Sequence, residues 1–144
     1  MNTAEQSMVD LALSIARQAH EEQLDKAGVD YIEHPIYVAS QVDSEEEKAV
    51  ALLHDVIEDS SVTAEELLNA GLPETVVTAV QILSKKKGQD YQTYLKTVKS
   101  NPLARAVKLA DLKHNSDLSR LETITDKDLK RLEKYKKAIN YLSM

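Results

Sequence analysis

Apolar residues recur along most of the chain at intervals of three and four positions, the spacing that places them on one face of an α-helix. The first such stretch contains Met8, Ala12, Ile15, Ala16 and Ala19. Glycine and proline are scarce, with three of each, and they stand between the periodic stretches or at their ends. The pattern therefore predicts an all-α protein.

Residues at the ends of these stretches predict about eight helices. Ser44 with Glu47, and Thr63 with Glu66, form capping boxes, and Gly71 is a typical helix stop. The expected helices run from the cap Thr3 to about Lys26, from Pro35 over a few residues, from Ser44 to about Ile57, from Thr63 to Gly71, from Pro73 to about Leu83, over about 89–99, from Pro102 to about Leu118, and from the cap Thr125 to Tyr141.

The composition narrows the classes of protein. A chain of 144 residues fits a single domain, 1–144, and the absence of cysteine excludes disulfides, thiolate metal sites and a cysteine nucleophile. The N-terminus lacks the features of a signal peptide, and no apolar stretch approaches the roughly 20 residues that span a bilayer. The net charge of −6 argues against nucleic-acid binding, and the lysines at 85–87 and 127–137 are interpreted as solvated helix ends. We expect a cytoplasmic protein with neither a membrane nor a nucleic-acid partner.

The segment ALLHDVIEDS, residues 51–60, combines a buried-looking apolar run with four ionisable groups, His54, Asp55, Glu58 and Asp59. Burying a carboxylate without a partner costs several kcal/mol, so such a cluster requires a cation or a full set of donors. Because neighbouring helical residues diverge by about 100°, His54 and Asp55 could share an ion only at the flank of their helix, with other ligands from elsewhere.

Two further residues could complete such a site. His34 directly precedes Pro35, and Asp111 lies in the apolar setting of AVKLADLKHN. Two imidazoles and two carboxylates suit Mn, Fe, Ni or Zn. Each residue also has a simpler interpretation: a histidine on an apolar face can be a hydrogen-bonded core residue, and a buried aspartate can be a cap or an ion-pair partner.

These pieces, in this order, resemble the HD-domain metal-dependent phosphohydrolases. Three segments are similar in sequence to the hydrolase domain of RelA/SpoT-type enzymes, which remove the 3′-pyrophosphate of (p)ppGpp: AHEEQLDKAGVDYIEHP, ALLHDVIEDS and VKLADLKHN. The resemblance covers about residues 10–120 and implies a helical HD-domain fold. It also implies that His34, His54, Asp55 and Asp111 bind a divalent metal, manganese in most of those hydrolases.

The same resemblance implies roles for other residues. Glu58 and Asp59 would be the acidic pair that handles the nucleophilic water, although a solvated helix end is the alternative. Asn115 and Lys26 would contact the nucleotide substrate, and Tyr31 could line the pocket or simply pack. His20 is interpreted as structural support, and His114 as a residue that orients a ligand.

Two positions depart from the family pattern. Asp25 stands where those hydrolases have an arginine that packs on guanine, and Leu112 replaces another arginine. The sequence thus leaves open whether guanine is recognised. The leading hypothesis is a hydrolase of a pyrophosphorylated nucleotide. The alternatives are an HD-type nucleotidase or phosphomonoesterase, and a non-catalytic module that binds metal and nucleotide. The native metal and the oligomeric state are not determined by the sequence.

Overall fold

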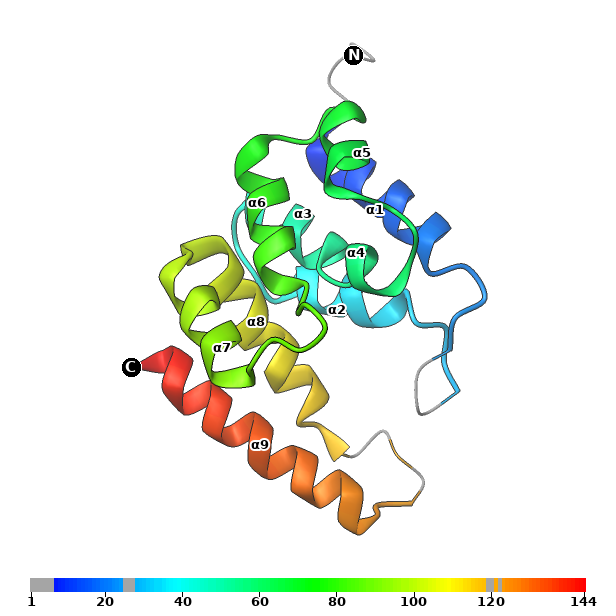
Figure 1. Ribbon diagram of the computed structural model, residues 1–144. Helices are drawn as coiled ribbons and strands as arrows, with labels where there is room; N and C mark the ends of the chain where they lie inside the picture. Colours follow the sequence, from blue (N-terminus) through cyan, green and yellow to red (C-terminus); the bar gives the residue numbers. More distant parts are fainter. Residues whose placement is uncertain (1–6, 25–27, 119–120, 122) are drawn as a thin grey trace.

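The computed structural model describes residues 7–24, 28–118, 121 and 123–144, and it is all-helical apart from one isolated bridge between Leu24 and Asp30 (Figure 1). The described residues form α1 (Met8–Ala19), α2 (Glu33–Ser40), α3 (Glu45–Leu53), α4 (Val56–Asp59), α5 (Ala64–Asn69), α6 (Glu74–Leu83), α7 (Tyr91–Ser100), α8 (Pro102–Asn115) and α9 (Asp126–Ser143). The predicted all-α class is confirmed. Within the described part of the chain, no helix has the length and apolar character needed to cross a bilayer.

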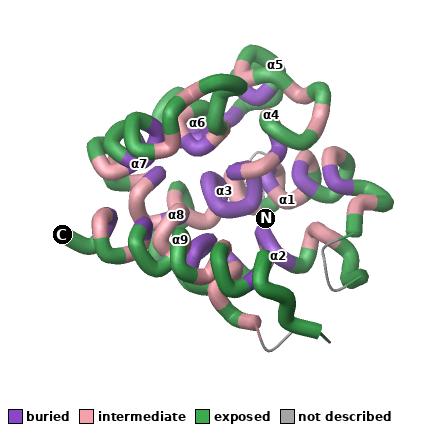
Figure 2. The backbone as a smooth tube through the Cα atoms, turned by 60° about the horizontal axis from the view of Figure 1, so that its bottom comes forward, coloured by how far each residue is buried: buried purple, intermediate pink, exposed green. Residues whose placement is uncertain are grey.

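Helix α3 is the centre of the fold. Every residue from Ala49 to Leu53 is buried, and α3 packs against α1, α2, α6 and α8. In Figure 2 its buried turns lie in the middle of the molecule, with the other helices around them. The core is made of Leu, Val, Ala and Tyr94, since the chain has neither Phe nor Trp. A central helix of this kind carries the residues that follow it, His54 and Asp55, into the interior.

The third expected helix is interrupted, and this corrects the sequence prediction. It was expected to run to about Ile57, but α3 ends at Leu53 and α4 begins only at Val56. The backbone at Asp55 has φ −104° and ψ −2°, outside the α-helical minimum. The carbonyl of Ala51, which a continuing helix would pair with the Asp55 N–H, accepts a hydrogen bond from His54 Nδ1 at 2.5 Å.

Most other helix ends agree with the sequence signals. Both expected capping boxes are present, and Gly71 follows α5 with φ 112°, a conformation that favours glycine. Helix α8 ends at Asn115, earlier than expected, and α9 begins after a third capping box formed by Thr125 and Asp128.

The start of the first helix differs from expectation. Thr3 and Lys26, the expected ends of this helix, lie outside the described residues. The described helix begins at Met8, where the Ser7 side chain accepts a hydrogen bond from the Asp10 N–H, and it ends at Ala19. Ser7 is thus the N-cap that the structure uses.

Candidate metal centre and active site

Three buried side chains, from α2, from α8 and from the turn after α3, converge in the interior of the fold. His34 comes from the first turn of α2, His54 follows α3, and Asp111 lies on α8. One ligand atom of each lies within 4.8 Å of the other two, and the residues are only 5%, 3% and 5% exposed. His34 Nε2 is 2.7 Å from Asp111 Oδ1, and His54 Nε2 is 3.5 Å from the same oxygen. We name these three residues the central triad.

Asp55, the fourth expected ligand, lies at the edge of the central triad. Its Oδ2 is 3.1 Å from His54 Nε2 and accepts a hydrogen bond from the Tyr31 hydroxyl. The break between α3 and α4 allows this, because His54 and Asp55 are no longer separated by a regular helical step. His54 and Asp55 therefore do not reach the site from the flank of one continuous helix, as the sequence suggested. The turn between α3 and α4 directs both side chains toward the central triad.

The hydrogen bonds of His54 leave one ring nitrogen available. A carbonyl can only accept, so His54 Nδ1 must carry the hydrogen that binds the Ala51 oxygen. Nε2 is buried and has no hydrogen-bond partner among the described residues. A neutral imidazole with Nδ1–H on a carbonyl and a free Nε2 lone pair is the usual form of a metal-binding histidine. The donor set of two imidazoles and carboxylates fits a first-row divalent cation.

The electrostatics of the central triad favour a positive charge. Burial disfavours the charged form of His54, but Asp55 and Asp111 outweigh it and raise the pKa of His54 well above its ordinary value. Burial opposes ionisation of Asp55 as well, yet His54 lowers the pKa of Asp55 to about 2. A proton can supply the positive charge that the two carboxylates require, and so can a metal cation.

Asp111 is held by partners on its own helix. Lys108 Nζ lies 3.2 Å from Asp111 Oδ2, and the Asn115 amide donates to Asp111 Oδ1 at 3.0 Å. Burial would raise the pKa of Asp111, but Lys108 and His54 hold it well below its usual range. Asn115, expected as a substrate contact, is thus found as a partner of Asp111. Leu112, at the second departure from the family pattern, is 1% exposed and packs in the core.

The acidic pair follows directly on α4. Glu58 Oε1 accepts a hydrogen bond from the Lys85 backbone N–H at 2.8 Å, and Glu58 lines a small cavity together with His54 and Asp55. Partial burial and, after it, the charge of Asp55 raise the pKa of both Glu58 and Asp59. A carboxylate with a raised pKa is a better proton acceptor, which suits a general base.

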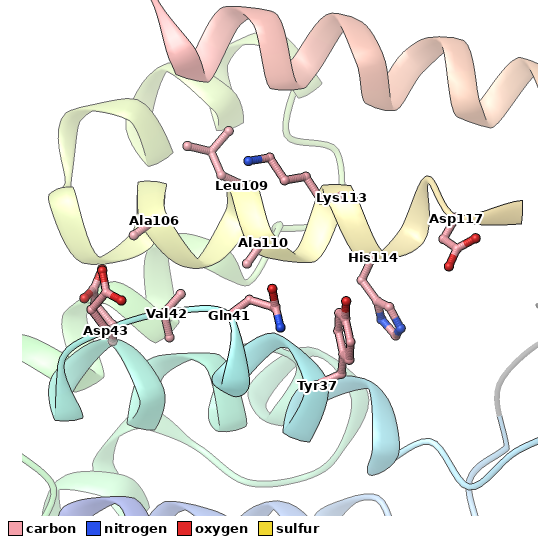
Figure 3. Close-up of a pocket in the computed structure, with 11 residues that line it drawn as sticks. Tyr37, Gln41, Val42, Asp43, Ala106, Leu109, Ala110, Lys113, His114 and Asp117 are labelled. Carbon is pink, nitrogen blue, oxygen red and sulfur yellow. The ribbon is translucent and has the colours of Figure 1, made fainter.

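Histidines beside the central triad support its position. His114 Nδ1 lies 2.6 Å from His34 Nδ1, and the two rings are nearly parallel. Tyr37 stacks on the His114 ring at a centroid distance of 4.2 Å. Figure 3 shows Tyr37 from α2 and His114 from α8 side by side in a second hollow of about 390 Å³. His20, 2% exposed, packs its ring against Tyr31 at 4.8 Å. Lys26 and Asp25 lie outside the described residues.

Sequence reasoning missed several contributors to the site, among them Lys108 and Tyr91. Lys108 and Tyr91 line the same cavity as His54, Asp55 and Glu58. Lys108 had a detectable signal, since it precedes Asp111 by three positions on a predicted helix, the spacing of neighbouring side chains. Tyr91 had none, because only the packing of α7 against α8 brings it to the cavity.

Comparisons with known proteins show the family of the chain. A family model described as an HD domain matches residues 12–115. The guanosine-3′,5′-bis(diphosphate) 3′-pyrophosphohydrolase of Haemophilus influenzae is 39% identical over 116 residues, which cover 70% of this chain and 17% of that protein. The GTP pyrophosphokinase rsh of Brucella melitensis is 30% identical over 124 residues, covering 76% of this chain and 16% of the relative. The chain thus spans less than a fifth of the length of these curated relatives.

A solved structure shows the same fold. It is described as a metazoan ortholog of SpoT that hydrolyzes ppGpp and plays a role in starvation responses. The TM-score is 0.75 and the sequence identity 23%, and the match covers 98% of this chain and 88% of that one. The resemblance to the hydrolase region of RelA/SpoT-type enzymes is therefore confirmed in sequence and in fold.

Proposed function

The chain belongs to the HD domain family, and on that premise we propose that it is a metal-dependent phosphohydrolase acting on a pyrophosphorylated nucleotide of the (p)ppGpp kind. The proposal rests above all on the central triad, whose three ligand atoms converge in a buried site in which His54 Nε2 faces the carboxylates of Asp55 and Asp111. The substrate class is supported by the name of one similar protein, a guanosine-3′,5′-bis(diphosphate) 3′-pyrophosphohydrolase, and by the description of the solved structure, an ortholog of SpoT that hydrolyzes ppGpp.

The metal ligands are His34, His54, Asp55 and Asp111, and the native ion is Mn²⁺. A divalent cation held there supplies Lewis-acid activation of water and of a phosphoryl oxygen. His34 and His54 would hold it through a ring nitrogen each, and Asp55 and Asp111 would offset its charge. Tyr31 fixes Asp55 by its hydroxyl, and Asn115 fixes Asp111 by its amide. These two hydrogen bonds fix the orientation of the carboxylates that would hold the ion.

Glu58 and Asp59 act on the water rather than on the metal. Their raised pKa values prepare one of them to accept the proton of the attacking water, and the Lys85 N–H holds Glu58 at the cavity. Lys26, which precedes α2 in the sequence, binds phosphate oxygens of the substrate. With Asp25 in place of the family arginine, the guanine base is held weakly. The protein acts in the cytoplasm, without a membrane or nucleic-acid partner.

A phosphate-release and pyrophosphate-release screen tests the proposal. Protein loaded with Mn²⁺ is offered ppGpp, pppGpp, the adenine 3′-pyrophosphate analogue and ordinary nucleoside mono-, di- and triphosphates. We expect pyrophosphate from the 3′-pyrophosphates and no comparable release from Asp111→Asn protein. Release of phosphate from monophosphates alone would assign a nucleotidase. Tight binding of ppGpp without turnover would assign a non-catalytic module.

A further inference from the structure

The hollow of about 390 Å³ between α2 and α8 is separate from the metal centre. Tyr37 and Val42 line it from α2 and the loop after it, and Ala106, Ala110 and His114 line it from α8 (Figure 3). We name it the α2–α8 groove. Because alanine side chains are short, Ala106 and Ala110 leave room in the groove for side chains from outside the molecule.

The groove and the candidate active site use different sides of α8. Successive residues of a helix are turned by about 100°, so Asp111 and Asn115 point away from the side that carries Ala106 and Ala110. An occupant of the groove therefore leaves the candidate active site open. Its binding can be measured independently of the proposed function.

The groove is acidic. Among the described residues that line it, Asp43, Glu47 and Asp117 stand against one lysine, Lys113. In Figure 3 Asp43 lies at one end of the groove, and Tyr37 lies nearer the other end. Tyr37 is 46% exposed, a large fraction for an aromatic side chain. The groove thus offers negative charge at one end and an exposed ring toward the other.

Basic residues gather in the other half of the chain. Of the 24 Asp and Glu residues, 17 lie in residues 1–84, and of the 18 Lys and Arg residues, 15 lie in residues 85–144. Helix α9 alone carries six lysines and arginines against three acids. Charge that is separated in this way favours contact between the unlike regions of two copies.

One flank of α9 is suited to the groove. Lys134 and Lys137 line a small hollow together with Tyr91, so their flank of α9 faces α7. Lys136 lies about 200° around the helix from Lys134, and Leu129 lies about two turns before Lys136, so both stand on the flank away from α7. Lys136 is exposed, and Leu129 is 51% exposed. This flank therefore combines an apolar side chain with a cation.

The arrangement of the helices brings this flank close to the groove. Helix α8 packs against α2 and against α9. Figure 3 shows α2 along one side of α8 and α9, the pale red helix, along the other. Figure 1 shows that α9 runs back along α8 toward the C-terminus. The basic helix and the acidic groove thus lie next to each other, which is the arrangement that a two-fold axis can exchange between two copies.

We propose that the α2–α8 groove binds α9 of a second copy of this chain, in a two-fold symmetric dimer. An axis parallel to α8, between the groove and α9, places α9 of each copy over the groove of the other. Leu129 of one copy then meets Tyr37 of the other, and Lys136 meets Asp43. Neither Asp43 nor Lys136 has an ion-pair partner within the described part of the chain, so both charges are available for this contact.

Symmetry doubles each of these contacts, because each copy presents both the groove and the helix. The interface is a narrow one between a single helix and a single groove, and it belongs to the small, transient class. Its ion pairs lie at the surface, so added salt screens them. The dimer should therefore form at high protein concentration and low ionic strength.

Sedimentation velocity from about 1 μM to about 1 mM protein, at low and at high salt, tests the dimer. Asp43→Lys and Lys136→Glu each turn two attractive contacts into two repulsive ones, and each should weaken association by at least about tenfold. An equimolar mixture of the two variants should restore the dimer, because both contacts then join opposite charges. Leu129→Ala should weaken association roughly tenfold without a change of net charge.

The next residue on α9 provides the matched control. Lys137→Glu changes the net charge as Lys136→Glu does, but it lies on the flank that faces α7, so it should associate as the wild type does. Since the chain has no cysteine, single cysteines add a measure of geometry. Asp43→Cys mixed with Lys136→Cys should form a disulfide-linked dimer on mild oxidation, and Asp43→Cys mixed with Lys137→Cys should not.

A wild type that stays monomeric at the highest concentration would overturn the inference and leave the groove to a different partner. Association that Lys137→Glu weakens as much as Lys136→Glu does, or that mixing of the two charge variants does not restore, would also overturn it, because another surface would then be responsible. The proposed function is tested separately: dimerisation is measured as mass, so hydrolysis by a monomer would refute only the dimer, and a dimer without turnover would refute only the activity.

Discussion

At the scale of single residues, His54 occupies the point where two carboxylates compete for one positive charge. Its Nε2 lies 3.1 Å from Asp55 and 3.5 Å from Asp111, with its other nitrogen bound to a carbonyl. Removing one partner of such a buried set leaves an uncompensated charge, which typically costs 3–5 kcal/mol. Substitutions at the centre therefore affect stability as well as activity, so tests of chemistry should use residues at its margin.

Glu58 and Asp59 are suitable for that test. If they act on water and not on the metal, the double variant Glu58→Gln, Asp59→Asn should keep its metal content and lose about 10²–10⁴ in kcat, with a smaller change in KM. Metal analysis and steady-state kinetics provide the measurement. Glu65→Gln, an exposed acid on α5, is the control and should behave as wild type. A double variant that lacks metal would show that the acids are ligands.

Asp55 and His54, which form a buried ion pair, contribute to the pH dependence of the stability of the metal-free protein. The lowered pKa of Asp55, about 2, gives stability that is present above the unfolded pKa near 4 and is lost as the pH falls toward 2. The raised pKa of His54 gives stability that is present below about pH 6.5 and is lost as the pH rises through the folded value. Urea midpoints in EDTA should therefore be highest between about pH 4 and 6.5.

Asp55→Asn is the variant for this experiment. The Asp55 contribution is worth roughly 2 kcal/mol by the size of its shift, so the acid limb between pH 4 and 2 should become shallower in the variant. The alkaline limb should also weaken, because Asp55 is the nearer carboxylate to His54. Identical midpoint profiles for the wild type and the variant would contradict the ion pair.

At the scale of elements, the two halves of the interrupted helix have separate tasks. The capping box of Ser44 and Glu47 begins α3, and Ala49–Leu53 carry it through the core to His54. The turn at His54 and Asp55 then lets α4 start in a new direction with the acidic pair. The cap at the start of α3 and its buried middle stabilise the fold, and the residues after its end form the candidate site.

Ser44→Ala tests this division. Loss of the cap should lower the free energy of unfolding by about 1 kcal/mol, because the Glu47 N–H loses its acceptor. The melting temperature should fall by roughly 2–4 °C, and kcat measured well below the unfolding transition should be unchanged. The control is Ser100→Ala, at the exposed last residue of α7, which should change the unfolding free energy by less than about 0.5 kcal/mol. A large loss of kcat in Ser44→Ala would show that the cap and the site are coupled.

At the scale of the whole molecule, the central triad joins α2, α8 and the end of α3, three helices that also pack against one another. An ion that binds only the folded state at a hundredfold excess over its Kd adds about 2.7 kcal/mol. EDTA should therefore lower the melting temperature of Mn²⁺-loaded protein by roughly 5–10 °C. Asp111→Asn, which keeps the shape of the side chain, should show no response to EDTA. Equal responses in the two proteins would place the ion elsewhere.

The sequence alone determined the helical class, most helix ends and the identity of the central residues. Capping boxes and a C-terminal glycine are interactions between residues one to four positions apart, so the local sequence decides them. Ser44, Thr63 and Gly71 behave as expected for this reason. The candidate ligands could be named because His and Asp in apolar surroundings require compensation wherever they lie.

The tertiary structure decided how those residues meet. His34 and His114 are 80 positions apart, Tyr31 and Asp55 are 24 apart, and no local pattern records either contact. The break after Leu53 went unpredicted because the His54 side chain competes for a backbone carbonyl only once its ring is fixed among buried neighbours. Lys108 and Tyr91 became visible as neighbours of one cavity only after α7 packed against α8. Long-range contacts of this kind depend on the packing of the whole core, and their positions cannot be obtained from the chain one segment at a time.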